Sequence, residues 1–110
     1  MNRRYVHLGV NPFGSGTNAV PNLNSILESY LVQRADYYRY ASQNYVLYTD
    51  ASLVQIANEI KSLPGFQLTY IFLSELNLAA GYFGWMHPDF WRWLAGERTT
   101  PSGAKIQALP

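Results

Sequence analysis

A chain of 110 residues with 48% apolar and only 14% charged residues is too apolar for a disordered protein and has the length of one folded domain. A net charge of +1, with no basic run longer than Arg3-Arg4, excludes a strong electrostatic grip on nucleic acid by a single protomer. The chain contains no cysteine, which excludes disulfides and thiolate sites, and it has neither a bilayer-spanning apolar stretch nor a signal peptide, so we expect a cytoplasmic protein without a membrane partner.

The first third of the chain predicts a strand, a loop and a helix. Residues 4–10 are a short apolar run that ends before Asn11-Pro12, as expected for a buried strand. Residues 13–21 are rich in Gly, Ser, Thr and Asn and predict a loop. Residues 22–34 then predict a helix, because apolar residues recur at helical spacing: Leu23, Ile26, Leu27, Tyr30 and Leu31.

The middle of the chain predicts a hairpin and a capped helix. Residues 37–40 and 45–49 are β-prone runs separated by a gap of hairpin length, so we expect them to be antiparallel neighbours. Ser52 and Gln55 fit a capping box, with Asp50 as an alternative cap. They precede an apolar stripe that runs to Pro64-Gly65 and consists of Leu53, Ile56, Ala57, Ile60 and Leu63.

The last third predicts a strand, a short helix and a tail. Residues 67–76 are a long β-prone apolar run, and Pro88 opens a short aromatic helix that Gly96 closes. Residues 104–109 alternate as an edge strand would. We therefore expect one domain over residues 1–96 and a tail over residues 97–110.

The order of these elements is β, α, β, β, α, β and a short helix. This order predicts an α+β protein of the ferredoxin-like βαββαβ type, with both longer helices on one face of a four-stranded antiparallel sheet. The other face must be solvated or covered, and its Tyr and Phe residues favour a partner subunit as the cover. The alternative interpretation of the high aromatic content is that a small domain needs large side chains to fill its core.

Several segments together resemble a known family. They are YVHLGVNP, the segment ADYYRYASQNYVLYTDASLVQIANEI at residues 35–60, TYIFLSEL, and Trp93-Leu94. This pattern of apolar spacing, which spans residues 4–94, resembles the SinR-like family related to CRISPR-associated protein 2. The resemblance implies a ferredoxin-like homodimer whose sheets pack face to face, with residues 104–109 pairing with the other protomer's sheet. Relatives in that fold include metal-dependent nucleases and dimers that hold DNA.

One departure from this family bears on activity. The nuclease relatives carry a metal-binding aspartate at the end of the first strand, where this chain has Gly9, Val10 and Asn11. None of the three is an acid, and the first acidic residue of the chain is Glu28. Because a hard cation needs anionic oxygen, the resemblance does not carry nuclease activity to this chain, and we expect no metal and no catalytic residues.

Other candidate catalytic features are also weak. Residues 9–17 resemble a phosphate-binding loop, but Ser15 and Gly16 stand where such a loop needs Lys and Ser or Thr, so we expect a turn and no bound nucleotide. His7 has no acid near it in sequence, and His87 is expected at a helix cap. The acids Asp36, Asp50 and Glu75 lie at element ends without the spacing of an acid–base pair; Glu75 is the best placed of them for a site.

Two groups of residues are candidates for binding. Residues 81–96 contain six aromatic side chains and predict either a stacking platform for bases, with Arg92 beside it, or a helix that caps the core or forms a dimer contact. We favour packing and take Trp91 and Arg92 as the candidate partner contacts. A dimer would double a modest phosphate-contacting patch, whose alternative interpretation is ordinary surface charge and whose members are Arg3, Arg4, Arg34 and Arg39.

The sequence therefore favours a non-catalytic, homodimeric binding protein without a cofactor. Its partner is a protein or nucleic acid. Two alternatives stay open: a metal-dependent endoribonuclease that uses other residues, and an antitoxin-like or structural dimer that acts by pairing alone.

Overall fold

The computed structural model describes residues 3–11, 22–67 and 69–96. The loop expected at residues 13–21 and the edge strand expected at residues 104–109 lie outside these ranges. In chain order the elements are β1 (Arg4–Asn11), α1 (Leu23–Leu31), β2 (Asp36–Ala41), β3 (Asn44–Thr49), α2 (Leu53–Lys61), β4 (Tyr70–Glu75), the short 3-10 helix η2 (Leu78–Ala80) and α3 (Pro88–Leu94).

One antiparallel sheet organises the described chain. Its strand order is β2-β3-β1-β4, so β1 lies between β3 and β4 while β2 and β4 form the two edges. Val6 of β1 lies opposite Leu47 of β3 and opposite Glu75 of β4, and both pairings are antiparallel. The predicted α+β class with a four-stranded antiparallel sheet is confirmed, and this arrangement is compatible with a ferredoxin-like sandwich.

Helix α1 is four residues shorter than the helix predicted over residues 22–34, by one residue at its start and three at its end. It begins after Asn22, which takes a left-handed conformation with φ of 56°, and it ends at Leu31. The amides of Gln33 and Arg34 bond to carbonyls three residues back, at Tyr30 and Leu31, and this tighter turn directs the chain into β2. The helix buries one side, made of Leu23, Leu27 and Leu31.

The hairpin and the second helix form as the sequence predicts. Strands β2 and β3 pair in antiparallel fashion, with a register shift between Arg39 and Ala41. The Ser52 side chain accepts a hydrogen bond from the Gln55 amide at 3.0 Å, so Ser52 and not Asp50 caps α2. The Gln55 side chain does not complete a capping box, because it donates to Glu59 instead.

Strand β4 is shorter than the strand predicted over residues 67–76 and ends one residue earlier, at Glu75. Strand β4 begins at Tyr70 and not at residue 67, because Phe66 and Thr69 take part in turns: the Thr69 amide bonds to the Phe66 carbonyl. Helix α3 has Pro88 in its first turn, as predicted, and its N-cap is His87, whose Nδ1 accepts from the Asp89 amide at 3.1 Å. Gly96 follows it with φ of 101°.

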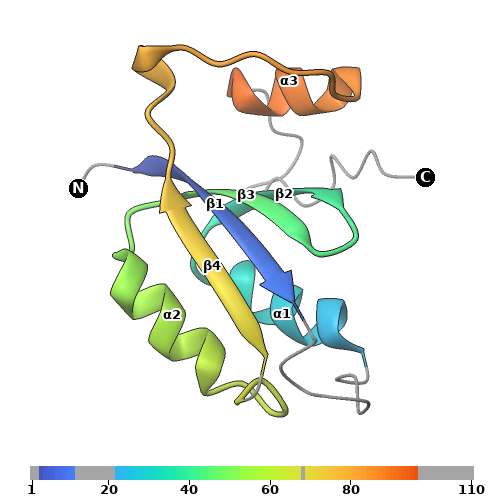
Figure 1. Ribbon diagram of the computed structural model, residues 1–110, viewed down its shortest axis with the longest axis vertical. Helices are drawn as coiled ribbons and strands as arrows, with labels where there is room; N and C mark the ends of the chain where they lie inside the picture. The colour runs from blue at the N-terminus through green and yellow to red at the C-terminus, as the bar shows by residue number, and fades with distance from the viewer. Residues whose placement is uncertain (1–2, 12–21, 68, 97–110) are drawn as a thin grey trace.

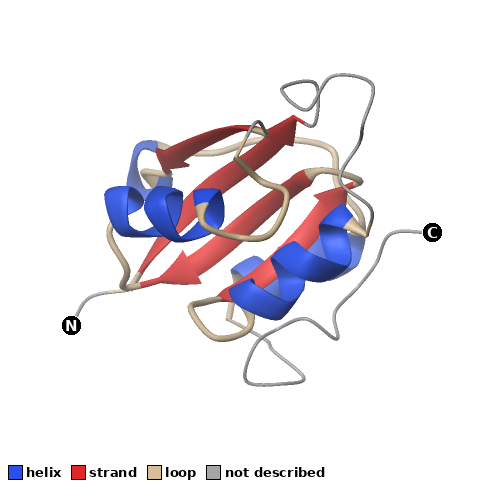
Figure 2. Ribbon diagram, turned by 90° about the horizontal axis from the view of Figure 1, so that it is seen from below, coloured by secondary structure: helices blue, strands red, loops and turns tan. Residues whose placement is uncertain are grey.

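The sheet has a helix layer on each face. Helices α1 and α2 lie together on the first face, and α3 lies on the opposite side of the sheet (Figure 1). Figure 2 shows two of these helices side by side over the strands. The main core fills the first face, with Val6, Leu8, Leu27, Leu31, Leu47, Ile56, Ile60 and Phe66 among its fully buried members. The other face, expected to be solvated or covered by a partner, is covered in part by the chain's own α3.

Candidate functional site

Helix α3 is held on the second face of the sheet by aromatic packing. Trp93 is fully buried, and its ring meets Tyr5 of β1 edge-on at 5.8 Å and lies 5.9 Å from Tyr38 of β2. Phe90 packs edge-to-face on Tyr38 with 5.4 Å between ring centroids. The Tyr5 hydroxyl donates to the Leu94 carbonyl at 2.8 Å, which fixes the end of the helix. The favoured interpretation of residues 81–96, a helix packed on the core, is thereby confirmed for Phe90 and Trp93.

Beside α3, the described residues form two adjoining cavities on this face. The first, of about 350 Å³, lies between the sheet, the segment from Leu76 to Met86 and α3. The second, of about 390 Å³, lies along β1 and β4. His7 lines both, so we call the two together the aromatic groove. Its aromatic lining is contributed by four parts of the chain and consists of Tyr40, Tyr70, Phe72, Tyr82, Phe83, Phe90 and Trp91.

A histidine–tyrosine pair forms the polar part of the groove floor. His7 Nε2 and the Tyr40 hydroxyl are 2.6 Å apart, and the two rings lie at 5.8 Å. Burial lowers the pKa of His7 below its usual 6.5 and raises the pKa of Tyr40 above its usual 10. Both shifts favour the uncharged forms, so the floor presents a neutral hydrogen-bonded pair.

Large aromatic side chains stand exposed around the groove. Phe83 and Trp85, in the segment between η2 and α3, are each 95% exposed. On β4, Tyr70 and Phe72 are 65% and 68% exposed, and they share the groove's face because they lie opposite Asn11 and Gly9 of β1. Aromatic groups this exposed and this close together are typical of a surface that binds a partner.

The described residues that line the groove carry no formal charge. Among residues 3–11, 22–67 and 69–96, no Lys, Arg, Asp or Glu lines either cavity. The polar groups there include the His7–Tyr40 pair, the hydroxyls of Tyr70 and Tyr82, and the side chains of Asn11, Asn44 and Asn77. Such a surface can bury apolar and aromatic groups and offer a few neutral hydrogen bonds. The described lining contributes neither an anionic nucleophile nor a cation for a phosphate.

The four arginines predicted as a phosphate-contacting patch each face a carboxylate. Arg3 and Arg34 line one polar cavity of about 700 Å³ together with Asp36 and Asp50. Arg3 lies 3.8 Å from Asp36, and Arg34 is bound to Glu59. Arg4 is close to this cavity, since it donates to the Ala51 carbonyl at 2.6 Å, and its Nε is 2.8 Å from Glu75.

Arg39 lies apart from the other three. Its Nη1 is 3.4 Å from the Glu28 carboxylate on α1, where the hydroxyls of Tyr37 and Tyr45 also donate to Glu28. Burial and the Glu28 charge raise the pKa of Tyr37 to about 12. The structure thus brings Arg3, Arg4 and Arg34 together and leaves Arg39 at another site.

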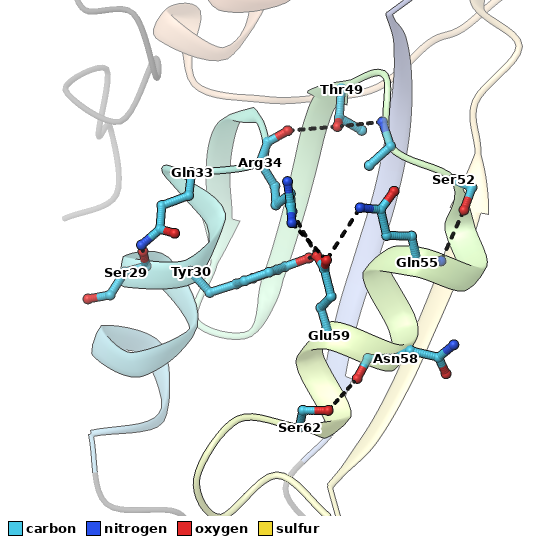
Figure 3. Close-up of polar contacts among 11 residues, drawn as sticks. Ser29, Tyr30, Gln33, Arg34, Thr49, Ser52, Gln55, Asn58, Glu59 and Ser62 are labelled. Carbon is cyan, nitrogen blue, oxygen red and sulfur yellow. Dashed lines mark hydrogen bonds and ion pairs between the residues drawn. The ribbon is translucent and has the colours of Figure 1, made fainter.

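Arg34 belongs to a clasp between α1 and α2 that Figure 3 shows. Its Nε and Nη2 each donate to the Glu59 carboxylate at 2.8 Å, and the Tyr30 hydroxyl donates to Glu59 at 2.6 Å. Gln55 adds a fourth, longer bond. The hydrogen bonds from Arg34 and then from Tyr30 lower the pKa of Glu59 to about 2. The clasp engages Arg34 in joining two helices, which is a structural role.

The two predicted partner-contact residues lie at different distances from the groove. Trp91 lines it and stacks on Tyr82 with 6.2 Å between ring centroids. Arg92 is exposed on α3 and is paired with Asp89 three residues earlier.

Glu75, the acid best placed for a site, is bound to Arg4. Among residues 3–11, 22–67 and 69–96, no three His, Asp or Glu side chains are grouped as metal ligands would be.

Sequence reasoning missed the groove because it lies between distant segments. The alternation of Tyr70 and Phe72, and that of Tyr38 and Tyr40, was a signal for one aromatic face. The face on which these residues lie depends on the pairing of β4 with β1, and the local sequence does not show that pairing.

The described helices have at most nine residues, too few to cross a bilayer.

Comparison of the chain with models of known protein families, with curated proteins and with solved structures found no match in any of the three.

Proposed function

We propose that this chain is a non-catalytic binding protein that acts as a homodimer and takes a protein partner in its aromatic groove. The observation that carries the proposal is the uncharged groove rimmed by exposed aromatic residues, of which Phe83 and Trp85 are each 95% exposed. Aromatic side chains dominate the binding energy of protein interfaces, and charged residues are depleted at their centres.

The charge distribution favours a protein over nucleic acid as the partner. The affinity of nucleic-acid-binding proteins comes largely from Lys and Arg groups that contact phosphates. Here Arg3, Arg4, Arg34 and Arg39 each face a carboxylate, and none of the described residues that line the groove is cationic. A partner that offers apolar and aromatic side chains matches this surface better than a phosphate backbone.

The ferredoxin-like class and the family resemblance form part of the same proposal. The element order β1-α1-β2-β3-α2-β4 and the strand order β2-β3-β1-β4 support a ferredoxin-like sandwich. The resemblance to the SinR-like relatives of CRISPR-associated protein 2, with its homodimer, stays a proposal drawn from the sequence pattern, and so does the separately expected cytoplasmic location.

The partner can be tested with peptides selected on the intact protein from a displayed random library. We expect the selected peptides to be rich in apolar and aromatic residues. In calorimetric titrations, their affinity should change little between 50 and 500 mM salt, which are about the limits at which phosphate binding would weaken by orders of magnitude. Replacing both Phe83 and Trp85 by Ala should abolish binding.

A matched control is Val54→Ala, because Val54 is a 70% exposed apolar residue on α2, away from the groove. Equal affinity for the groove variant and the control would refute the groove as the binding surface. A salt-sensitive gel shift of labelled RNA or DNA, lost in the groove variant, would assign the groove to nucleic acid. Analytical ultracentrifugation at micromolar concentration should give the mass of a dimer, and a monomer would refute that part of the proposal.

A further inference from the structure

Within the described strands, β4 forms one edge of the sheet, and it lacks the usual protection of an edge strand. Natural edge strands discourage pairing with charged side chains, proline or a bulge. The other edge strand, β2, has such features, because it carries Asp36 and Arg39 and has a register shift after Arg39. Strand β4 contains no proline and only one charged residue, Glu75 at its last position, and it pairs without a register shift.

The backbone of β4 has groups directed outward. The Leu76 amide donates to the Tyr5 carbonyl of β1 at 2.8 Å. Because backbone groups alternate sides along an antiparallel strand, the amides and carbonyls of Ile71, Leu73 and Glu75 point away from β1. In the described part of the chain, no strand lies against that edge. Residues with outward amides and carbonyls, such as Ile71 and Leu73, can form a ladder with one more strand.

We propose that this edge pairs with the same edge of a second copy, so that β4 and the partner's β4 join two sheets into one continuous antiparallel sheet. The inference rests on the homodimer proposed above, but it replaces the face-to-face packing that the family resemblance implies with an edge-to-edge contact. It also places the two aromatic grooves on one common face, since Tyr70 and Phe72 of both copies lie on the same side of the joined sheet.

Self-pairing of this strand has two plausible registers, and the side chains favour one. With Phe72 opposite the partner's Phe72, Ile71 lies opposite the partner's Leu73 and Tyr70 opposite the partner's Ser74. This register joins apolar residues on the core side and makes an aromatic cross-strand pair on the groove side. It also leaves the two Glu75 side chains at opposite ends. A shift that sets Leu73 opposite its own copy would place each Glu75 against an apolar Ile71.

The lack of cysteine in the chain allows a direct test of this register. In the favoured register, Phe72 and its copy form a non-hydrogen-bonded pair with Cα atoms about 4.5 Å apart, within the range of a disulfide. Full-length Phe72→Cys should therefore double in mass on a non-reducing gel after mild oxidation. Tyr70→Cys and Ser74→Cys alone should not, since their twins lie about 13 Å apart along the strand, but a mixture of the two should cross-link.

The failure of this inference can be told apart from failure of the proposed homodimer. If ultracentrifugation gives a dimer but Phe72→Cys does not cross-link, the homodimer stands and the β4 contact is wrong. Cross-linking of Phe72→Cys to Gln107→Cys in a mixture would assign the edge to the tail over residues 97–110 and overturn the inference. As a second variant, Phe72→Lys places like charges opposite each other and should give a monomer, while the control Val54→Lys should remain a dimer.

Discussion

Replacement of Trp93 by Ala tests whether α3 belongs to the folded domain. Trp93 is fully buried against Tyr5, Tyr38 and Phe90. A tryptophan buries about 200 Å², and at about 25 cal/mol per Å² this is worth about 5 kcal/mol. Measured Trp→Ala changes in cores cost about 3–5 kcal/mol. We therefore expect Trp93→Ala to lower the free energy of unfolding by about 3–5 kcal/mol, measured by urea denaturation with far-ultraviolet circular dichroism.

Two further variants make this test decisive. Trp85→Ala removes the same side chain from a 95% exposed position, so its cost should stay within about 0.5 kcal/mol. Trp93→Phe keeps an aromatic ring and should cost about 1–3 kcal/mol, which gives a measurable protein if Trp93→Ala does not fold. A loss below about 1 kcal/mol for Trp93→Ala, or equal losses at the two positions, would refute the docking of α3 on the sheet.

Three further predictions concern polar contacts. Glu59→Gln should lower the free energy of unfolding most at neutral pH. Its difference from the parent should shrink as pH falls from 4.5 to about 2, because the contacts of Glu59 supply stability only while the carboxylate is ionised. Urea denaturation across this pH range measures the difference. Tyr5→Phe should cost about 0.5–1.5 kcal/mol in the same denaturation experiments, since it removes the bond to the Leu94 carbonyl. The His7 imidazole should titrate below pH 6.5 in a proton NMR series and return toward 6.5 when urea unfolds the chain.

A specific result would contradict each of these predictions. A constant difference between Glu59→Gln and the parent from neutral pH to about 2 would mean that Glu59 is not selectively stabilised in its ionised form. Tyr70→Phe, which changes an exposed tyrosine, is the control for Tyr5→Phe, and equal costs would argue against the bond to Leu94. A His7 midpoint at or above 6.5 in the folded protein would contradict a buried imidazole on the groove floor.

The features that the sequence predicts well are those set by neighbouring residues. The Ser52 cap and the apolar stripe of α2 lie within a few residues of each other, and Pro88 marks the start of α3 by its own geometry. The ends of β4 and α1 were less accurate, because turns at Thr69 and at Gln33 overrode the local apolar pattern. The tertiary path of the chain, and not the local sequence pattern, determines such turns.

The candidate site depends on contacts between distant residues, which single-sequence reasoning does not provide. Arg4 and Glu75 are 71 residues apart in sequence, yet they form an ion pair across β1 and β4. Their pairing changes Arg4 from a free cation into a neutralised one. His7 likewise meets Tyr40 through β3, which lies between their strands in the sheet. The aromatic residues were visible in the sequence, but their common surface was not.

The division of the second sheet face gives the protein two kinds of built-in optical probe. Trp93 is sealed between α3 and the sheet, whereas Trp85 stands in water beside the groove and Trp91 lines the groove. Indole emission shifts to shorter wavelength in an apolar environment, so the buried and the groove residues respond to different events. Unfolding moves the emission of Trp93 to the red, and a partner that covers Trp85 and Trp91 moves their emission to the blue. One fluorescence spectrum of the unlabelled chain can therefore follow folding and docking at once.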